Sequence, residues 1–207
     1  LASLASLFQQ TLNPEQRKPA EDQIGQLQAQ PRFGFLLLAL VQSESTSTAI
    51  RLASAIQFKN LCKTRWNVDA ETEDPVFSAI SDDEKQAIRQ QLVPVLVSLA
   101  SASTPSQAIL SQMNESVALV ASSDFPEAWP ALIDELVSQL STDNHHVLLS
   151  VLATSHAIFK QWRSQFRSDA LYSEINLVLG KMANPLLELL QRMHGTVSYT
   201  HLRAHET

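Results

Sequence analysis

The run of eight residues from position 123 to 130 constrains the fold more than any other local sequence in this chain. It is Ser-Asp-Phe-Pro-Glu-Ala-Trp-Pro, and long apolar segments with helical spacing lie on both sides of it. Asp124, Pro126 and Pro130 are expected to end one helix and start the next, because proline cannot continue a helix interior. The Phe and Trp of the run are large apolar groups, so we expect a packed turn rather than a loose one.

Apolar residues recur at the helical period along most of the chain. Only 4 glycines and 9 prolines occur among 207 residues, and no Asn-Gly or Asp-Gly hairpin signal separates alternating segments, which argues against a β fold or a disordered chain. The pattern predicts helices over 2–12, 14–28, 31–41, 48–66, 81–100, 107–122, 132–140, 145–166 and 169–193. An acidic stretch from Asn67 to Ile80 is expected to form a surface loop.

Several expected helix boundaries depend on particular residues. Asn13 is expected to be the N-cap of a helix that begins at Pro14. Ser81 and Glu84 have the spacing of a capping box at the start of another helix. Pro94 should kink or split that helix, and Asn184-Pro185 could interrupt the last one.

The predicted helices fall into pairs that begin near residues 2, 31, 81 and 126, with a half pair from 169. The later spacings approach the ~40–47 residues of HEAT-type helix pairs. The run Phe58-Lys59-Asn60-Leu61 is also similar to Phe159-Lys160-Gln161-Trp162; chance similarity is the alternative, but the spacing favours true repetition. We therefore expect an all-α fold, a right-handed α-solenoid of HEAT-type antiparallel helix pairs with about four and a half repeats, over residues 1–193.

Residues 194–207 depart from this pattern. They have no apolar stripe of helical period and resemble vector or adaptor sequence, so we expect a non-native tail. The chain begins at Leu1 without a methionine or a basic leader, and we expect a fragment of a longer protein.

The composition limits the partners. The formal charge is 15 − 21 = −6, which argues weakly against nucleic acid as the main partner. No apolar run reaches the ~18 residues of a membrane span, so we expect no membrane insertion. Cys62 is the only cysteine, which excludes an intramolecular disulfide and fits a reducing compartment.

Motifs that carry catalysis or metal binding are missing from the sequence. The four glycines are isolated, and no Cys-x-x-Cys or His-Glu-x-x-His run occurs. Cys62 is expected to be a buried apolar residue, and His156 a satisfied core or groove histidine. His201 and His205 have ligand spacing but lie in the suspect tail. We expect no catalytic residue, no metal site and no cofactor, and therefore not an enzyme.

The helix predicted over 48–66 carries a basic stripe. Lys59 and Lys63 are four residues apart and share one side, while Arg51 and Arg65 lie on neighbouring sides. Two interpretations stay open with equal weight: a solvated edge, or a polar strip on a concave wall that grips a partner.

Several of these runs resemble the importin-beta superfamily. They are Ala20-Glu21 with Leu27, Pro31 and Phe33; Arg51-Leu52-Ala53 with Phe58-Lys59-Asn60 and Trp66; the 124–130 turn; and His156 to Leu171 with its Phe-Lys-Gln-Trp-Arg and Phe-Arg-Ser-Asp runs. The last of these is similar to the exportins that return importin-alpha, also called cellular apoptosis susceptibility exportins. The resemblance covers about residues 4–193.

The resemblance implies a nuclear export receptor. Such a receptor binds Ran-GTP cooperatively with importin-alpha, contacts nuclear pore proteins, and shuttles between nucleus and cytoplasm. It implies that this chain is the N-terminal Ran-binding part, with Glu21, Lys59, Asn60 and Lys63 as contact residues. The alternative is a generic HEAT-repeat scaffold that assembles protein complexes without binding Ran, because the fold alone does not separate the two.

Overall fold

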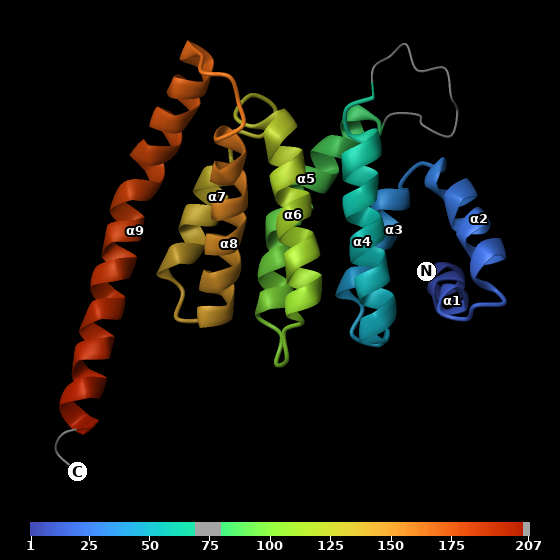
Figure 1. Cartoon of the computed structure of the whole chain (residues 1–207), viewed down its shortest axis with the longest axis horizontal. Helices are drawn as coiled ribbons and strands as arrows, with labels where there is room; N and C mark the ends of the chain where they lie inside the picture. Colours follow the sequence, from blue (N-terminus) through green and yellow to red (C-terminus); the bar gives the residue numbers. More distant parts are fainter. Residues whose placement is uncertain (69–79, 205–207) are drawn as a thin grey trace.

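The computed structural model of this chain is built from helices stacked side by side in two layers (Figure 1). It describes residues 1–68 and 80–204, and side chains up to position 194. No strand occurs in these ranges, which confirms the all-α fold. The helices are α1 (Ala2–Thr11), α2 (Arg17–Gln28), α3 (Phe33–Gln42), α4 (Thr48–Arg65), α5 (Asp82–Ala100), α6 (Gln107–Asp124), α7 (Leu132–Ser138), the 3₁₀ helix η2 (Gln139–Ser141), α8 (His145–Trp162) and α9 (Asp169–Ala204).

The two layers follow the order of helices within each pair. One layer, called here the second-helix layer, consists of α4, α6 and α8, each packed on the next (Figure 1). The other contains α3, α5, α7 and α9, again in contact with their neighbours along the row. α3 packs against α4 and α5 against α6, while the α1–α2 pair reaches the stack through α1 and α4. This arrangement confirms the predicted solenoid of helix pairs.

One apolar core runs through the whole stack. Buried side chains form a continuous cluster from Leu4 on α1 to Leu189 on α9. Its largest fully buried members include Phe58, Leu92 and Met113, at the centres of α4, α5 and α6. Burying each side chain of this size contributes roughly 1.5–3 kcal/mol to the free energy of folding, so the apolar contacts between helix pairs hold the two layers together.

Two predicted helix boundaries are wrong because short-range hydrogen bonds form turns where the sequence predicts helix. α2 begins at Arg17 rather than Pro14. The Asn13 side chain accepts a hydrogen bond from the Glu15 N–H at 3.1 Å, and the Asn13 carbonyl accepts from Gln16 at 3.1 Å, which closes a turn before the helix. α8 ends at Trp162 rather than Phe166. The N–H groups of residues 163–165 donate to the carbonyls three residues earlier, as in a 3₁₀ turn, and not four residues earlier as in an α-helix.

The start of α5 confirms half of the expected capping box. Ser81 accepts the Glu84 N–H at 3.3 Å, as an N-cap should. The Glu84 carboxylate instead accepts the backbone N–H of Arg32 at 3.0 Å. Arg32 has a φ of 64°, a left-handed conformation that costs a non-glycine residue about 1–2 kcal/mol, and this hydrogen bond helps to offset that cost. Pro94 lies inside α5 without splitting it.

The end of the chain also differs from expectation. α9 is continuous from Asp169 to Ala204, so Pro185 does not interrupt it and the helix extends past Met193. The non-native origin of residues 194–207 stays a prediction. The expected acidic loop falls mostly on positions 69–79, outside the described residues.

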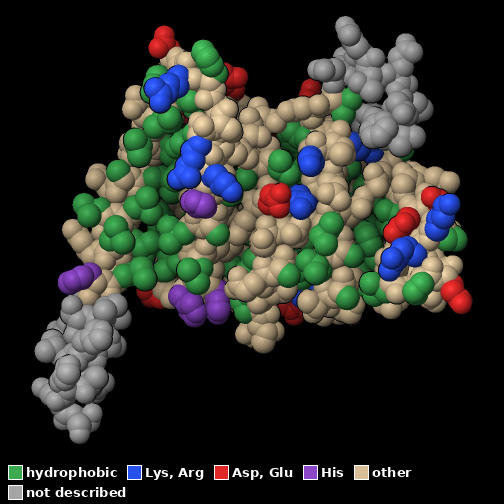
Figure 2. All heavy atoms as spheres, viewed as in Figure 1, with side chains coloured by type: hydrophobic (Ala, Val, Ile, Leu, Met, Phe, Trp, Pro, Cys, Tyr) green, Lys and Arg blue, Asp and Glu red, His purple; other side chains and the backbone are tan. Residues whose placement is uncertain are grey.

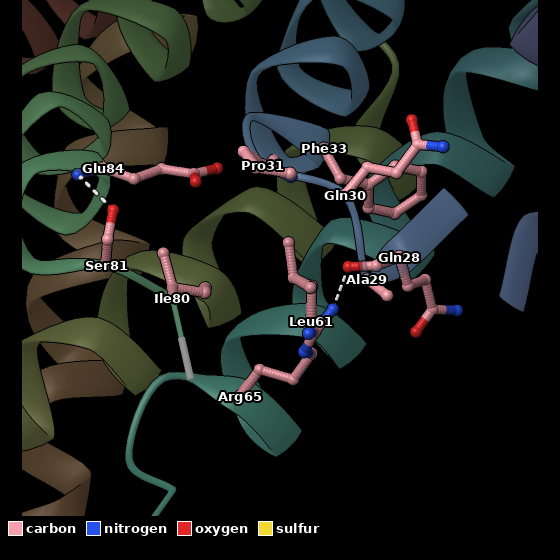
Figure 3. A pocket seen from close by; sticks show the side chains of 11 residues that line it. Gln28, Ala29, Gln30, Pro31, Phe33, Leu61, Arg65, Ile80, Ser81 and Glu84 are labelled. Carbon is pink, nitrogen blue, oxygen red and sulfur yellow. Dashed lines mark hydrogen bonds between the residues drawn. The ribbon is translucent and has the colours of Figure 1, made fainter. Parts of the chain in front are cut away.

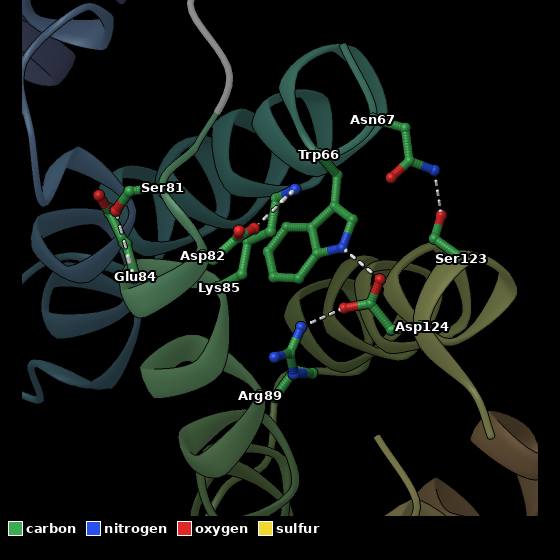
Figure 4. Close-up of polar contacts among 9 residues, drawn as sticks. All are labelled: Trp66, Asn67, Ser81, Asp82, Glu84, Lys85, Arg89, Ser123 and Asp124. Atoms are coloured by element: carbon green, nitrogen blue, oxygen red, sulfur yellow. Dashed lines mark hydrogen bonds and ion pairs between the residues drawn. The ribbon is translucent and has the colours of Figure 1, made fainter. Parts of the chain in front are cut away.

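The turn at 123–130 is packed, as predicted. Figure 4 shows its Asp124 side chain beside Trp66 and Arg89. Phe125 and Trp129 are 8% and 4% exposed. Asp124 does not break α6 but is its last residue, and its carbonyl accepts the Trp129 N–H at 2.8 Å. Its carboxylate accepts the indole N–H of Trp66, the residue directly after α4, at 3.0 Å and pairs with Arg89 on α5. The Asp124 carboxylate therefore ties α4, α5 and α6 together.

We expect Asp124→Asn to lower the free energy of unfolding by about 2–4 kcal/mol, because it leaves the Arg89 guanidinium buried without its counter-charge. Urea denaturation measures the change. Asp134→Asn is the matched control: it removes an ion pair to Lys181 of 2.7 Å whose side chains are 62% and 31% exposed, and should cost at most about 1 kcal/mol. Equal losses in the two variants would contradict the role given to Asp124.

Glu135 on α7 offers a second stability test. Burial raises the pKa of this carboxyl, an effect only partly offset by a hydrogen bond from Trp129. Its Oε2 is buried and makes no hydrogen bond within the described residues. Because the pKa of Glu135 is higher in the folded chain than in the unfolded chain, this carboxyl stabilises the fold when the pH is below its unfolded pKa. That contribution is lost as the pH rises through its folded pKa. Glu135→Gln should thus raise the Tm at neutral pH, and the gain should vanish in acid.

Thermal denaturation across the acidic to neutral range tests this expectation. Glu127→Gln, at an exposed position of the same turn, is the control and should change the Tm little at any pH. A gain for Glu135→Gln that does not depend on pH would show that the carboxylate charge is not its cause.

Candidate partner-binding face

The exposed side of the second-helix layer carries polar side chains that bridge neighbouring helices. Lys59 on α4 forms an ion pair with Glu115 on α6, with the two charged atoms 3.3 Å apart. The side chains are 21% and 55% exposed, so the pair lies at the surface between the two helices. Figure 2 shows charged side chains of both signs meeting in this central region. Sequence reasoning missed the pair, although Glu115 is the only acidic residue between Glu84 and Asp124.

The structure brings three of the four predicted contact residues together. Lys59, Asn60 and Lys63 lie on α4, where Asn60 and Lys63 are exposed and Lys59 is partly covered. Glu21 is exposed on α2, a different helix, and no hydrogen bond or ion pair joins it to the other three in the described part of the chain. A role of these residues in binding stays a prediction.

The two arginines beside this stripe have structural partners. Arg51 donates to the Val41 carbonyl at 2.8 Å and so ties α4 to the end of α3. Arg65 is only 4% exposed and donates to the Gln28 carbonyl. Burial lowers the pKa of Arg65, and the nearby Glu84 carboxylate opposes that shift. The basic stripe is therefore divided: Lys63 faces solvent, while the arginines hold the fold.

Arg65 lies beside a small pocket of about 180 Å³ where α2 ends and α5 begins (Figure 3). Its walls combine the α2–α3 connection with Leu61, Ile80 and Glu84. The volume is below the roughly 300–1,000 Å³ of sites for drug-sized ligands. We interpret this pocket as a joint between repeats.

α6 and α8 are tied by uncharged groups. The Asn114 side-chain oxygen accepts the hydroxyls of Ser150 and Thr154 at 3.2 and 2.9 Å. Nearer the end of α8, Gln161 donates to the Ala118 carbonyl at 3.1 Å. A surface groove of about 320 Å³ runs between the two helices, next to these contacts. These contacts could not be predicted from the sequence, because small polar residues on helices have no distinctive spacing.

The residues considered for chemistry have other roles. Cys62 is buried, as predicted, and burial raises the pKa of its thiol, which keeps it protonated and unreactive. His156 is exposed on α8, which contradicts the core alternative, while a place in a groove stays a prediction. The described residues contain no cluster of three metal-ligating side chains and no helix long and apolar enough to cross a bilayer. The side chains of His201 and His205 lie outside them.

Comparison with known proteins places the chain in a family. The importin-beta N-terminal domain matches residues 20–98, and the Cse1 family matches residues 158–206. Exportin-2 of Drosophila melanogaster is 35% identical over 193 residues, which are 92% of this chain and 19% of that protein. The importin alpha re-exporter of Saccharomyces cerevisiae is 35% identical over 198 residues, 96% of this chain and 20% of that protein.

The chain belongs to the importin-beta superfamily. A solved structure of the exportin Cse1 in its cargo-free, cytoplasmic state superposes with a TM-score of 0.79 at 34% identity, covering 92% of this chain and 19% of that one. This result confirms the resemblance to the importin-beta superfamily that the sequence runs within 20–66 and 156–171 indicated. This superfamily member spans about a fifth of the length of these relatives.

The Lys59–Glu115 pair gives a direct test of the geometry of the exposed face. A double-mutant cycle with Lys59→Met and Glu115→Gln should give a coupling energy of about 0.2–1 kcal/mol, since both side chains are partly exposed. Urea denaturation in low and high salt measures it, and salt should reduce it. A coupling of zero in low salt would show that the pair does not form in solution.

Proposed function

We propose that this chain is the N-terminal Ran-binding part of a nuclear export receptor. The receptor binds Ran-GTP cooperatively with importin-alpha, returns importin-alpha to the cytoplasm, and passes the nuclear pore by contact with nuclear pore proteins. The observation that carries the proposal is the match of nearly the whole chain, at 35% identity, to proteins named exportin-2 and importin alpha re-exporter. A shuttling receptor resides in both nucleus and cytoplasm.

The geometry of the second-helix layer supports a protein-binding role. Its helices lie side by side with one face open, and polar groups such as Asn60 and Lys63 project from that face without a role in the core. A stacked solenoid offers an extended surface of this kind to a macromolecule. Lys59 and Glu115 form an ion pair on that face. A partner that binds Lys59 therefore has to displace Glu115 or add its own carboxylate beside it.

Cooperativity has a physical basis in the same stack. Because the repeats contact only their neighbours, small rotations at each interface add up to a change in curvature. Two partners that favour the same curvature raise each other's affinity by the same factor. The core between α4, α6 and α8 is continuous, which lets a change at one interface reach the next.

Retention of the chain on immobilised Ran tests the proposal. We expect binding to Ran loaded with GTP and much weaker binding to Ran loaded with GDP. Lys63→Glu should weaken binding by about tenfold, the effect of losing roughly 1.4 kcal/mol at an interface. Lys181→Glu makes the same charge change on α9, away from the proposed contact, and should leave binding almost unchanged.

Each outcome has a meaning for the proposal. Retention on neither form of Ran would favour the alternative, a HEAT-repeat scaffold for complex assembly without Ran. Equal losses in Lys63→Glu and Lys181→Glu would move the contact away from α4. The cooperative part is tested by titrating importin-alpha with and without Ran-GTP, and equal affinities would contradict it.

A further inference from the structure

The most exposed large apolar side chain in the described part of the molecule is Phe166, which is 90% exposed. It lies in the connection between α8 and α9 and belongs to a run that the sequence comparison singled out but the proposed Ran contact does not use. Single apolar residues at a surface are common, but a phenylalanine exposed to this degree leaves almost its whole ring in water. This ring is therefore available to a partner.

The backbone around Phe166 holds the ring outward. After Trp162, the N–H of Ser164 donates to Gln161 at 3.1 Å and that of Gln165 donates to Trp162 at 3.3 Å, which winds the end of α8 tightly. Ser168 then caps α9 by accepting the Leu171 N–H at 3.2 Å. Only Phe166 and Arg167 lie between these two hydrogen-bonded segments.

The neighbouring aromatic side chains are engaged elsewhere. Phe159 and Trp162 stack with their ring centroids 4.8 Å apart, and both are packed against the core. The Trp162 indole donates to the Glu174 carboxylate at 2.8 Å and so joins α8 to α9. Phe166 is thus not a displaced member of this cluster, because the cluster is complete without it.

Three basic residues lie within six positions of Phe166 in the sequence. Lys160, Arg163 and Arg167 are all exposed, and none forms an ion pair within the described residues. No acidic residue lies between Asp143 and Asp169, although the chain as a whole has a charge of −6. Figure 2 shows lysine and arginine side chains gathered toward the C-terminal end of α8. By contrast, Lys59 on the same layer is already paired with Glu115.

We propose that Lys160, Arg163, Phe166 and Arg167 form a docking surface for an acidic polypeptide segment that carries apolar side chains. Aromatic and arginine side chains are enriched among the residues that dominate binding energy at protein interfaces, and here they lie between the last turn of α8 and the start of α9. Carboxylates would pair with the guanidinium groups, while an apolar group would cover the Phe166 ring. The surface is separate from Lys63 on α4, so it goes beyond the proposed Ran contact.

An acidic polypeptide fits this surface better than a nucleic acid does. Stable phosphate binding needs many cations along a groove, whereas this surface has only three basic residues, and the remainder of the chain is acidic. The overall negative charge repels any acidic partner at long range, so binding depends on close contact with this local group.

Fluorescence anisotropy with a synthetic probe tests the surface on the intact chain. The probe is a short labelled peptide in which pairs of Glu alternate with Leu and Phe, and the matched peptide has Gln in place of every Glu. We expect the acidic peptide to bind about tenfold more tightly at low salt. Arg163→Glu should remove that preference, and Phe166→Ala should weaken both peptides by about tenfold.

Controls keep the test specific. Lys18→Glu makes the same charge change at an exposed site on α2 and should leave peptide binding unchanged. The substituted side chains are exposed, so circular dichroism and Tm should match the parent chain. Equal affinity for the two peptides, no effect of Phe166→Ala, or tighter binding of an oligothymidine than of the acidic peptide would each overturn the proposal. Ran and importin-alpha are absent from this assay, so its failure leaves the proposed function standing.

Discussion

No helix pair in this chain can bury its apolar side chains alone, and the structure depends on sharing that surface with the next pair. The continuous core from Leu4 to Leu189 passes through every interface between the layers. The hydrophobic effect is not directional, so it brings the pairs together without fixing how they are rotated. The stack needs further contacts to select one arrangement.

Buried polar contacts between helices favour one rotation of each helix pair on the next. The Asp124 carboxylate contacts Trp66, just after α4, and Arg89 on α5, and Arg65 donates a hydrogen bond to the Gln28 carbonyl of the preceding helix pair. A charged group in a buried place is costly unless its partners are correctly positioned, so these contacts penalise other rotations of one pair on the next. The turn at 123–130 adds apolar packing beside the Asp124 contacts, because Phe125 and Trp129 belong to the continuous core.

The open face of the second-helix layer has three regions with different electrostatics. Between α4 and α6 the Lys59–Glu115 pair balances the charge, and between α6 and α8 the ties around Asn114 are neutral. At the end of α8 the basic groups lack such partners in the described structure. A solenoid can thus present separate binding surfaces on one continuous layer, because each surface is made by one or two helices.

Much of the fold could be predicted because helical periodicity and turn residues are local signals. The helix pairs, the packed turn and the burial of Cys62 follow from spacings within one or two turns of helix. The start of α2 could not be predicted, since Asn13 bonds equally well as an N-cap or within a turn. The continuity of α9 through Pro185 was not evident either, because proline disfavours a helix interior and the packing of α9 along α7, which helps to offset that cost, depends on a distant segment.

The candidate partner-binding face shows most clearly how far prediction from the sequence can go. The sequence determined that α4 carries a basic stripe and that the chain is a helical repeat protein of the importin-beta superfamily. Only the tertiary structure decided that Lys59 is paired, that Arg65 is buried, and that Phe166 is exposed. These properties depend on which helix lies next to each side chain, and that neighbour is set by packing between segments far apart in the sequence.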